Sequence, residues 1–302
     1  MPTGTGRIII PSQQDLQWHS LALQDRGTRP VLRLTVKSAK IDVTYDLFPN
    51  ATDSSSPELC RDNALDAVIH HISPIPGYSD IQQIRKTEHA PVSGRPLAIA
   101  SFFVATEDGT RVEQLNLLGI SSSATACAEI RIAKSKFKPD DQSNMSAQLE
   151  AFVFEPDYKP SPQDYYNLGT IFYTVNKSYE SAALYYQRAL DTLPNNSALN
   201  TRRVVTDQLA MSYGLGGQIK ESRAINEAAI KTDSAYPLYY YNLACADAQD
   251  GNANDAKLHL QQAFDRKANT LPGEHLPDPT QDDSILKLKK NKDFWAFVQT
   301  LK

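Results

Sequence analysis

The chain has 302 residues, 41% of them apolar and 22% charged, so it is long enough for two domains with hydrophobic cores. Its formal net charge of −4 gives no indication of a nucleic-acid partner, because such proteins carry a surplus of Lys and Arg. No apolar run approaches the roughly 20 residues that a membrane-spanning helix needs. The amino terminus lacks a basic segment followed by an apolar one, which leaves two alternatives, a cytoplasmic protein and a mature exported protein without its signal peptide.

Residues 1–155 have the pattern of an α+β domain. Alternation of apolar and polar residues predicts strands over residues 7–10, 31–36, 41–45, 97–105, 111–118 and 126–134. A helix is predicted to begin after Ser56, because a Ser cap is followed there by Pro57 and Glu58, and to end before Pro74. A second helix is predicted over residues 141–154. Short turns between neighbouring strands favour an antiparallel sheet with helices packed on it.

The Ile-Ile-Pro opening, the Trp that follows it, and the closing strands and helix make this half similar to the small α+β domains of the PsbP and Mog1-like families. Two of the three cysteines, Cys60 and Cys127, also lie here. An oxidising compartment would allow them to form a disulfide, and the alternative is two buried thiols.

Residues 156–163 are predicted to be a Pro-rich linker, since Pro156, Pro160 and Pro162 stop a helix or a central strand. The composition also changes at this point, because twelve of the fourteen tyrosines lie at or after Tyr158. A separate domain is therefore expected beyond the linker.

Residues 164–302 contain an internal repeat. A Leu is followed by a small residue three times, and further small residues come 12 or 13 and then 7 positions later. Such residues allow two helices to cross closely. The three sets are Gly169, Ala182 and Ala189; Ala210, Ser222 and Ala229; Ala244, Ala256 and Ala263.

This spacing resembles the tetratricopeptide repeat (TPR), with its pattern W-x2-L-G-x2-Y, A-x3-F, A and P. The resemblance implies an all-α superhelix of three helix pairs, over residues 164–196, 197–235 and 236–268. Gly217 and Gly251 would occupy the tight turns. The first repeat is one residue longer and lacks this Gly, so Asn176 is expected in the left-handed position. In the third repeat Asp247 replaces an aromatic residue, which predicts a weaker core.

The last segment resembles the one found after bacterial TPR arrays, and it predicts a capping helix over residues 281–300 that covers the end of the stack. Its apolar residues are Ile285, Leu288, Phe294, Trp295, Phe297 and Val298.

In TPR proteins the first helix of each pair lines a concave groove. Applied to this sequence, the resemblance places in the groove Tyr166, Thr170, Tyr173, Asp207, Met211, Leu215, Tyr241, Cys245 and Gln249. We expect Tyr166, Tyr173 and Tyr241 to be partly exposed, and Tyr165 and Tyr240 to be more buried. The alternative is that most tyrosines simply form the core between helices.

Catalytic patterns are lacking: the six histidines show no metal-ligand spacing, and no phosphate-binding loop or nucleophile elbow occurs. We therefore expect no cofactor and no enzymatic activity. The function predicted is an adaptor that binds a peptide or helix of another protein in the TPR groove. The TPR carboxylate clamp is disfavoured, because Tyr166 and Thr170 stand where it needs Lys and Asn. The alternative is a ligand-binding or enzymatic amino-terminal domain that the repeats recruit to its partner.

Overall fold

A computed structural model describes residues 6–10, 17–26, 29–38, 41–49, 56–89 and 95–301. The chain divides into two compact units, Met1–Pro160 and Ser161–Lys302. We call them the amino-terminal and the carboxy-terminal unit and describe each by itself.

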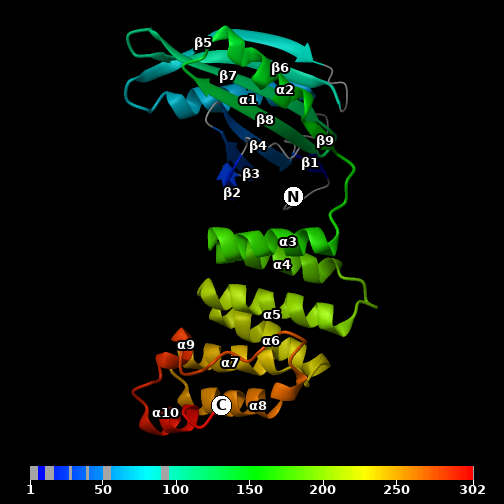
Figure 1. Cartoon of the computed structure of the whole chain (residues 1–302), viewed down its shortest axis with the longest axis vertical. Helices are drawn as coiled ribbons and strands as arrows, with labels where there is room; N and C mark the ends of the chain where they lie inside the picture. Colours follow the sequence, from blue (N-terminus) through cyan, green and yellow to red (C-terminus); the bar gives the residue numbers. More distant parts are fainter. Residues whose placement is uncertain are drawn as a thin grey trace. The chain divides into compact units, whose positions relative to one another are not determined.

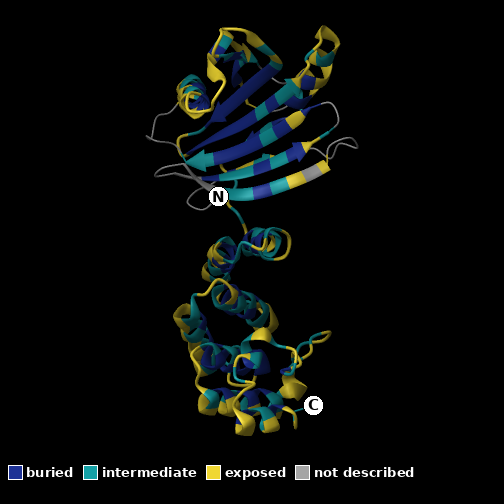
Figure 2. Cartoon of the chain, turned by 90° about the vertical axis from the view of Figure 1, so that its left-hand side faces the viewer, coloured by how far each residue is buried: buried dark blue, intermediate teal, exposed yellow. Residues whose placement is uncertain are grey.

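The core of the amino-terminal unit is a seven-stranded antiparallel sheet in the order β2-β3-β4-β8-β7-β6-β5. Most residues of the central strands β6, β7 and β8 are buried, whereas β5 at one edge is mostly exposed (Figure 2). The strands are β2 Gln17–Arg26, β3 Arg29–Lys37, β4 Asp42–Pro49, β5 Tyr78–His89, β6 Leu97–Thr106, β7 Arg111–Ser122 and β8 Ala126–Ser135. The predicted α+β architecture is therefore present.

One helix covers each face of this sheet. Helix α1 (Pro57–Ile72) begins as predicted, with the Ser56 hydroxyl accepting from the Leu59 amide, and it packs on Ile120 of β7. Successive residues of a strand point to opposite faces, so Gly119 faces the other side. There the methyl groups of Leu149, from α2 (Gln142–Glu150), approach Gly119 so closely that a Cβ atom would lie 2.9 Å away. A short 3-10 turn, η1 (Pro139–Asp141), leads into α2.

A disulfide joins α1 to the sheet: Cys60 is bonded to Cys127 of β8, with the two Cα atoms 6.5 Å apart. Both residues are buried in the cluster between α1 and the sheet. The bond closes a loop across 67 residues and thereby restrains the unfolded chain.

The sequence analysis missed both edge strands, β2 and β5, and it extended the second helix too far. Helix α2 ends at Glu150, and Val153–Glu155 form strand β9, which pairs with β1 (Arg7–Ile9) in a separate two-stranded sheet. The apolar run that suggested a longer helix belongs to this strand, where Phe154 is buried. Exposed β5 has little apolar alternation, so it carries no strand signal.

The carboxy-terminal unit is built from three antiparallel helix pairs (Figure 1). The pairs are α3 Pro162–Ile171 with α4 Tyr179–Thr192, α5 Leu199–Leu215 with α6 Ile219–Thr232, and α7 Pro237–Gln249 with α8 Ala253–Asp265. The small residues lie at the crossings as predicted: Ala182, Ala210, Ala244 and Ala256 have no exposed surface. Gly217 and Gly251 turn the chain with φ of +79° and +77°.

The first repeat accommodates its extra residue in a π-helical turn, η2 (Phe172–Asn176), at the end of α3. A π turn places one more residue in the helix without breaking it. The left-handed residue is Lys177, with φ of +54°, so the prediction of Asn176 is wrong by one position. Helix α3 also begins inside the predicted linker, because Ser161 caps it and Pro162 takes the first position.

Asp247, which was predicted to weaken the core of the third repeat, is buried with two partners. It is 1% exposed and its carboxylate accepts from Arg223 of α6 at 2.7 Å and lies 2.6 Å from Nδ1 of His259 of α8. These contacts connect three helices at a point where the repeat pattern has an aromatic ring.

The predicted capping helix is two short helices, α9 (Asp283–Leu286) and α10 (Lys292–Val298). The break occurs because Asn291 caps a new helix, its side chain accepting from the Phe294 amide. The predicted apolar residues do cover the end of the stack, with Ile285, Phe294 and Val298 buried against α7 and α8.

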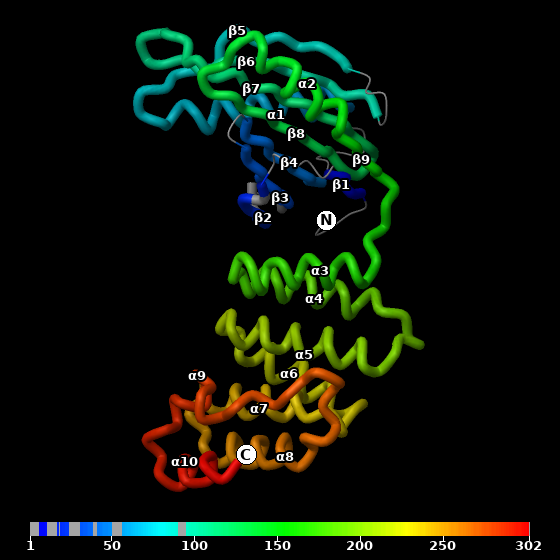
Figure 3. Tube along the Cα trace, viewed as in Figure 1, coloured from blue at the N-terminus to red at the C-terminus, as the bar shows by residue number. Residues whose placement is uncertain are grey.

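After α8 and a 3-10 turn, η3 (Lys267–Asn269), the chain runs back across α7 before it reaches α9 (Figure 3). Tyr236, at the start of α7, donates to Glu274 at 2.8 Å, and Tyr241 donates to Asp282 at 3.4 Å. We call residues 270–282 the return segment. It places irregular chain against the helix that the repeat pattern assigns to the groove.

Candidate functional site

A cavity of about 430 Å³ lies between α5, α7 and the return segment with the start of α9. We call it the α5–α7 cavity. Six of the nine predicted groove residues line it: Asp207, Met211, Leu215, Tyr241, Cys245 and Gln249. Residues one helical turn apart share one face of a helix, so the three from α5 and the three from α7 each form a continuous stripe.

The apolar residues that line this cavity differ in exposure. Leu215 is 54% exposed at its mouth, whereas Leu238 is 9% exposed and lies deeper. Met211 of α5 and Ile219, the first residue of α6, add apolar surface. Polar side chains, among them Asp207, Asn242 and Gln249, line the cavity beside these apolar residues, and apolar walls with polar groups between them are typical of sites that bind a ligand.

Tyr241 is buried, at 2% exposure, so the prediction that it would be partly exposed is wrong. The return segment covers the Tyr241 side chain, and its hydroxyl donates a hydrogen bond to the Asp282 carboxylate. The same carboxylate lies 3.7 and 3.8 Å from the Cys245 thiol and caps α9 through the Ser284 and Ile285 amides. Burial and the nearby Asp282 raise the pKa of Cys245 well above its usual value, which makes the thiol a poor nucleophile.

Asp207 is 5% exposed and lines the same cavity. Its Oδ1 accepts from the Asn242 side-chain amide of α7 at 2.8 Å. In the part of the chain that the structure describes, no Lys, Arg or His forms an ion pair with it. Burial, and to a smaller extent the charge of Glu274, raise the pKa of Asp207 to about 7.

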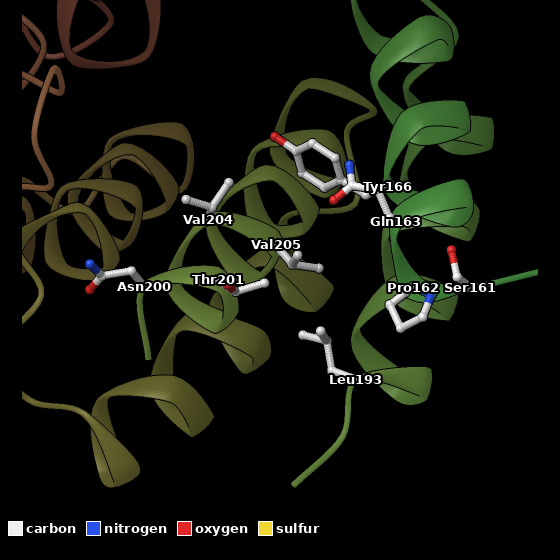
Figure 4. Close-up of a pocket in the computed structure, with 9 residues that line it drawn as sticks. All are labelled: Ser161, Pro162, Gln163, Tyr166, Leu193, Asn200, Thr201, Val204 and Val205. Atoms are coloured by element: carbon white, nitrogen blue, oxygen red, sulfur yellow. The ribbon is translucent and has the colours of Figure 1, made fainter. Parts of the chain in front are cut away.

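A second pocket, of about 510 Å³, lies between α3 and α5, and we call it the α3–α5 pocket. Figure 4 shows Gln163 and Tyr166 on α3 and Val204 and Val205 on α5 at this pocket. None of its lining residues is charged. Tyr166 is half-buried, and its ring lies 5.5 Å from that of Tyr186.

The structure does not bring the two remaining predicted residues into either cavity. The Thr170 hydroxyl lies 3.2 Å from the Tyr186 hydroxyl, which donates to it, and Thr170 itself donates to the carbonyl of Tyr166. Tyr173 packs edge-on against Tyr179, with ring centroids 5.5 Å apart. Tyr165 and Tyr240, at 8% and 5% exposure, are buried as expected.

Sequence reasoning missed the lining residues of the carboxy-terminal segment, His275, Pro277, Asp282, Asp283 and Ser284. The acidic stretch was visible, but nothing in the repeat spacing indicates that it returns over α7. Gln249 donates to the Ser284 hydroxyl at 2.9 Å and accepts from Lys287, so the predicted groove position serves to hold this segment.

Two buried carboxylates of the amino-terminal unit are paired with arginines, one on the neighbouring strand and one on the same strand. Asp46 and Glu129 face each other on neighbouring strands, with 0% and 1% exposure. Asp46 accepts from Arg33, and Glu129 accepts from Arg131 at 3.0 Å. Within the described ranges, no three His, Cys, Asp or Glu side chains are grouped so as to hold a metal ion, and no helix is long and apolar enough to cross a membrane.

No family model and no curated protein matches this chain, so the resemblance of residues 1–155 to PsbP and Mog1-like domains is not supported. Among solved structures, the chain is similar to the Sgt2 TPR domain from Aspergillus fumigatus, at 18% identity and a TM-score of 0.34, over 47% of this chain and 83% of that chain. At these values the likeness carries no conclusion about function. The assignment of the repeats depends on the three helix pairs and their small crossing residues.

Proposed function

We propose that this protein is a non-enzymatic adaptor whose carboxy-terminal unit binds a segment of another protein along α5. One observation carries the proposal: six of the nine residues that the TPR resemblance places in the groove line a single cavity between α5 and α7. The alternative, that they are spread through the core, is what a purely structural role would produce.

The two pockets extend the binding surface along one helix. The α3–α5 pocket is lined from α5 by Asn200, Thr201, Val204 and Val205, and the α5–α7 cavity is lined from the same helix by Asp207, Ala210, Met211, Gly214 and Leu215. A peptide or helix that follows α5 would therefore contact both. Met211 and Leu215 stand at the open side of the cavity, where apolar anchors of a partner gain most from leaving water.

The test is capture of proteins from a lysate by the full chain, compared with two variants. Met211→Ala with Leu215→Ala removes the apolar wall of the cavity, and neither residue is part of a buried cluster. Leu258→Ala, on α8 outside the cavity, removes an equally exposed Leu at 53% exposure. We expect proteins that the wild type and Leu258→Ala capture and the double variant does not. Equal capture by all three forms would contradict the proposal.

A further inference from the structure

We propose that the α5–α7 cavity receives a Lys or Arg side chain of the bound protein segment, with Asp207 as its counter-charge. The inference rests on the proposed function and adds the chemistry of the partner to it. The steps that support it are the charge of the lining, the environment of Asp207, and the continuation of the site along α5.

The lining of the cavity is acidic. It holds three carboxylates, Asp207, Asp282 and Asp283, together with His275, and it contains no Lys or Arg. Lys287 lies nearby, but it donates to the Gln249 amide oxygen. A cavity whose charges have one sign attracts a ligand group of the other sign.

Asp207 differs from the other buried carboxylates of the chain. Asp46, Glu129 and Asp247 are each 0–1% exposed, and each is paired with an arginine. Asp207 is 5% exposed and receives one amide hydrogen bond from Asn242. Burying an ionised carboxylate is costly unless a cation accompanies it. Among these four carboxylates, an arginine pairs with the three that do not line the α5–α7 cavity, and in the described part of the chain no ion pair is formed by Asp207, which does line it.

The apolar walls fit the aliphatic stem of the same side chains. Met211, Leu215 and Leu238 line the cavity around the carboxylate. Lys and Arg cover apolar surface with their methylene groups while the charged end reaches a polar partner. A free inorganic cation would leave these walls without contact.

The occupant is a peptide rather than a free amine, because the site continues beyond the cavity. The uncharged α3–α5 pocket lies along the preceding turns of α5. The segment expected has a basic residue at Asp207 and neutral or apolar residues that reach Tyr166 and Val204. Because the α5–α7 cavity is acidic and the α3–α5 pocket is uncharged, the bound segment would lie along α5 in one orientation.

The experiment is selection of a phage-displayed random peptide library on the full chain and on Asp207→Asn, which keeps the size of the side chain. We expect a Lys or Arg to recur at one position of the peptides selected by the wild type, and this preference to disappear on Asp207→Asn. The strongest wild-type peptide is then resynthesised with norleucine in place of the Lys, which removes the charge and keeps the stem. This peptide should bind the wild type at least about tenfold more weakly and should bind both proteins equally. It requires no change in the protein, so it decides the matter if Asp207→Asn fails to fold.

Three other results would overturn the inference in distinguishable ways. Peptides without a basic preference whose binding is lost with Met211→Ala and Leu215→Ala would leave the proposed function intact and refute the charge pairing. If spermidine displaces the peptide, binds as tightly as the peptide and depends on Asp207 for its binding, the cavity is a site for a free amine. If the selection yields no peptide whose binding depends on Met211 and Leu215, that result would contradict the proposed function itself.

Discussion

At the scale of single residues, the close crossing of α3 and α4 is decided by Gly169. A Cβ atom there would lie 2.7 Å from Cδ1 of Tyr186, whose ring is 1% exposed and whose hydroxyl donates to Thr170. The ring is held at both ends and cannot move aside cheaply. The repeat pattern has a small residue at this position because a larger side chain would collide with the packed ring.

Gly169→Ala is expected to destabilise the protein by about 1–3 kcal/mol, because the added methyl group must displace a packed ring. Gly214→Ala is the matched control: its Cβ would meet only the Ser222 hydroxyl, at 3.6 Å, and helix propensity would favour it by up to about 1 kcal/mol. Thermal unfolding followed by circular dichroism measures both. Equal effects of the two substitutions would mean that the crossing does not limit the first repeat.

Asp207 also makes the stability of the protein depend on pH. Its pKa is raised from 3.8 to about 7 in the folded chain, so the unfolded chain ionises first as pH rises. Stability that is complete below about pH 4 is therefore lost progressively up to about pH 7, by as much as about 4 kcal/mol. The other titratable groups whose charges interact with it are Glu274, Tyr173, Tyr236 and Tyr239.

Asp207→Asn removes this titration. We expect the variant to unfold at a higher temperature than the wild type at about pH 8 and at the same temperature at about pH 4. Melting curves across this range check the prediction. A difference between the two proteins that is constant with pH would show that Asp207 keeps an ordinary pKa.

At the scale of helices and turns, two features depart from the repeat pattern. The π turn η2 absorbs the additional residue of the first repeat and moves the left-handed position to Lys177. The buried Asp247 holds α6, α7 and α8 together through Arg223 and His259. For each feature, two substitutions can be compared whose expected changes in unfolding free energy differ in sign or in size.

Lys177→Gly is expected to stabilise the protein by about 1 kcal/mol, since Gly adopts a φ of +54° without the penalty that a side chain carries. Asn176→Gly, one position earlier in the π turn, should destabilise it by about 0.5–1 kcal/mol. Urea unfolding distinguishes the two. The reverse order would restore Asn176 as the left-handed residue.

Arg223→Ala is expected to cost about 3 kcal/mol, because it leaves the carboxylate of Asp247 buried without its arginine. The same guanidinium also binds Asp250, whose side chain is 55% exposed. Asp250→Ala should therefore cost less than about 1 kcal/mol. Comparable losses of unfolding free energy for the two variants would show that the buried contact contributes little.

At the scale of the whole molecule, local periodicity made one unit far more predictable than the other. Helix crossings recur in the sequence through Gly169, Ala210 and Ala244, and the resemblance of this spacing to the TPR then implied the helix pairs and their groove positions. Edge strand β5 has few buried residues and no such signal. The return segment was unpredictable for another reason: its place over Tyr241 depends on irregular backbone and on contacts between residues about 40 positions apart.

The candidate site divides in the same way. Its α5 and α7 walls were predicted from the repeat, whereas its acidic wall, Asp282 and Asp283, comes from the return segment and the start of α9. Asp207 was named as a groove residue, but its lack of a cationic partner is visible only in three dimensions. For the amino-terminal unit we propose a role as a second contact, an anchor or a regulatory part of the adaptor.

The central claim is that a partner lies against α5 and α7, and photo-crosslinking from position 215 tests it most directly. Leu215, 54% exposed at the mouth of the cavity, is replaced by p-benzoylphenylalanine in the full chain, and Leu258, 53% exposed on α8, is replaced in a parallel control. We expect light-dependent crosslinks to a partner from position 215, reduced by Met211→Ala, and none from position 258. Crosslinks from position 258 alone, or from neither position while the amino-terminal unit by itself captures the partner, would contradict the account.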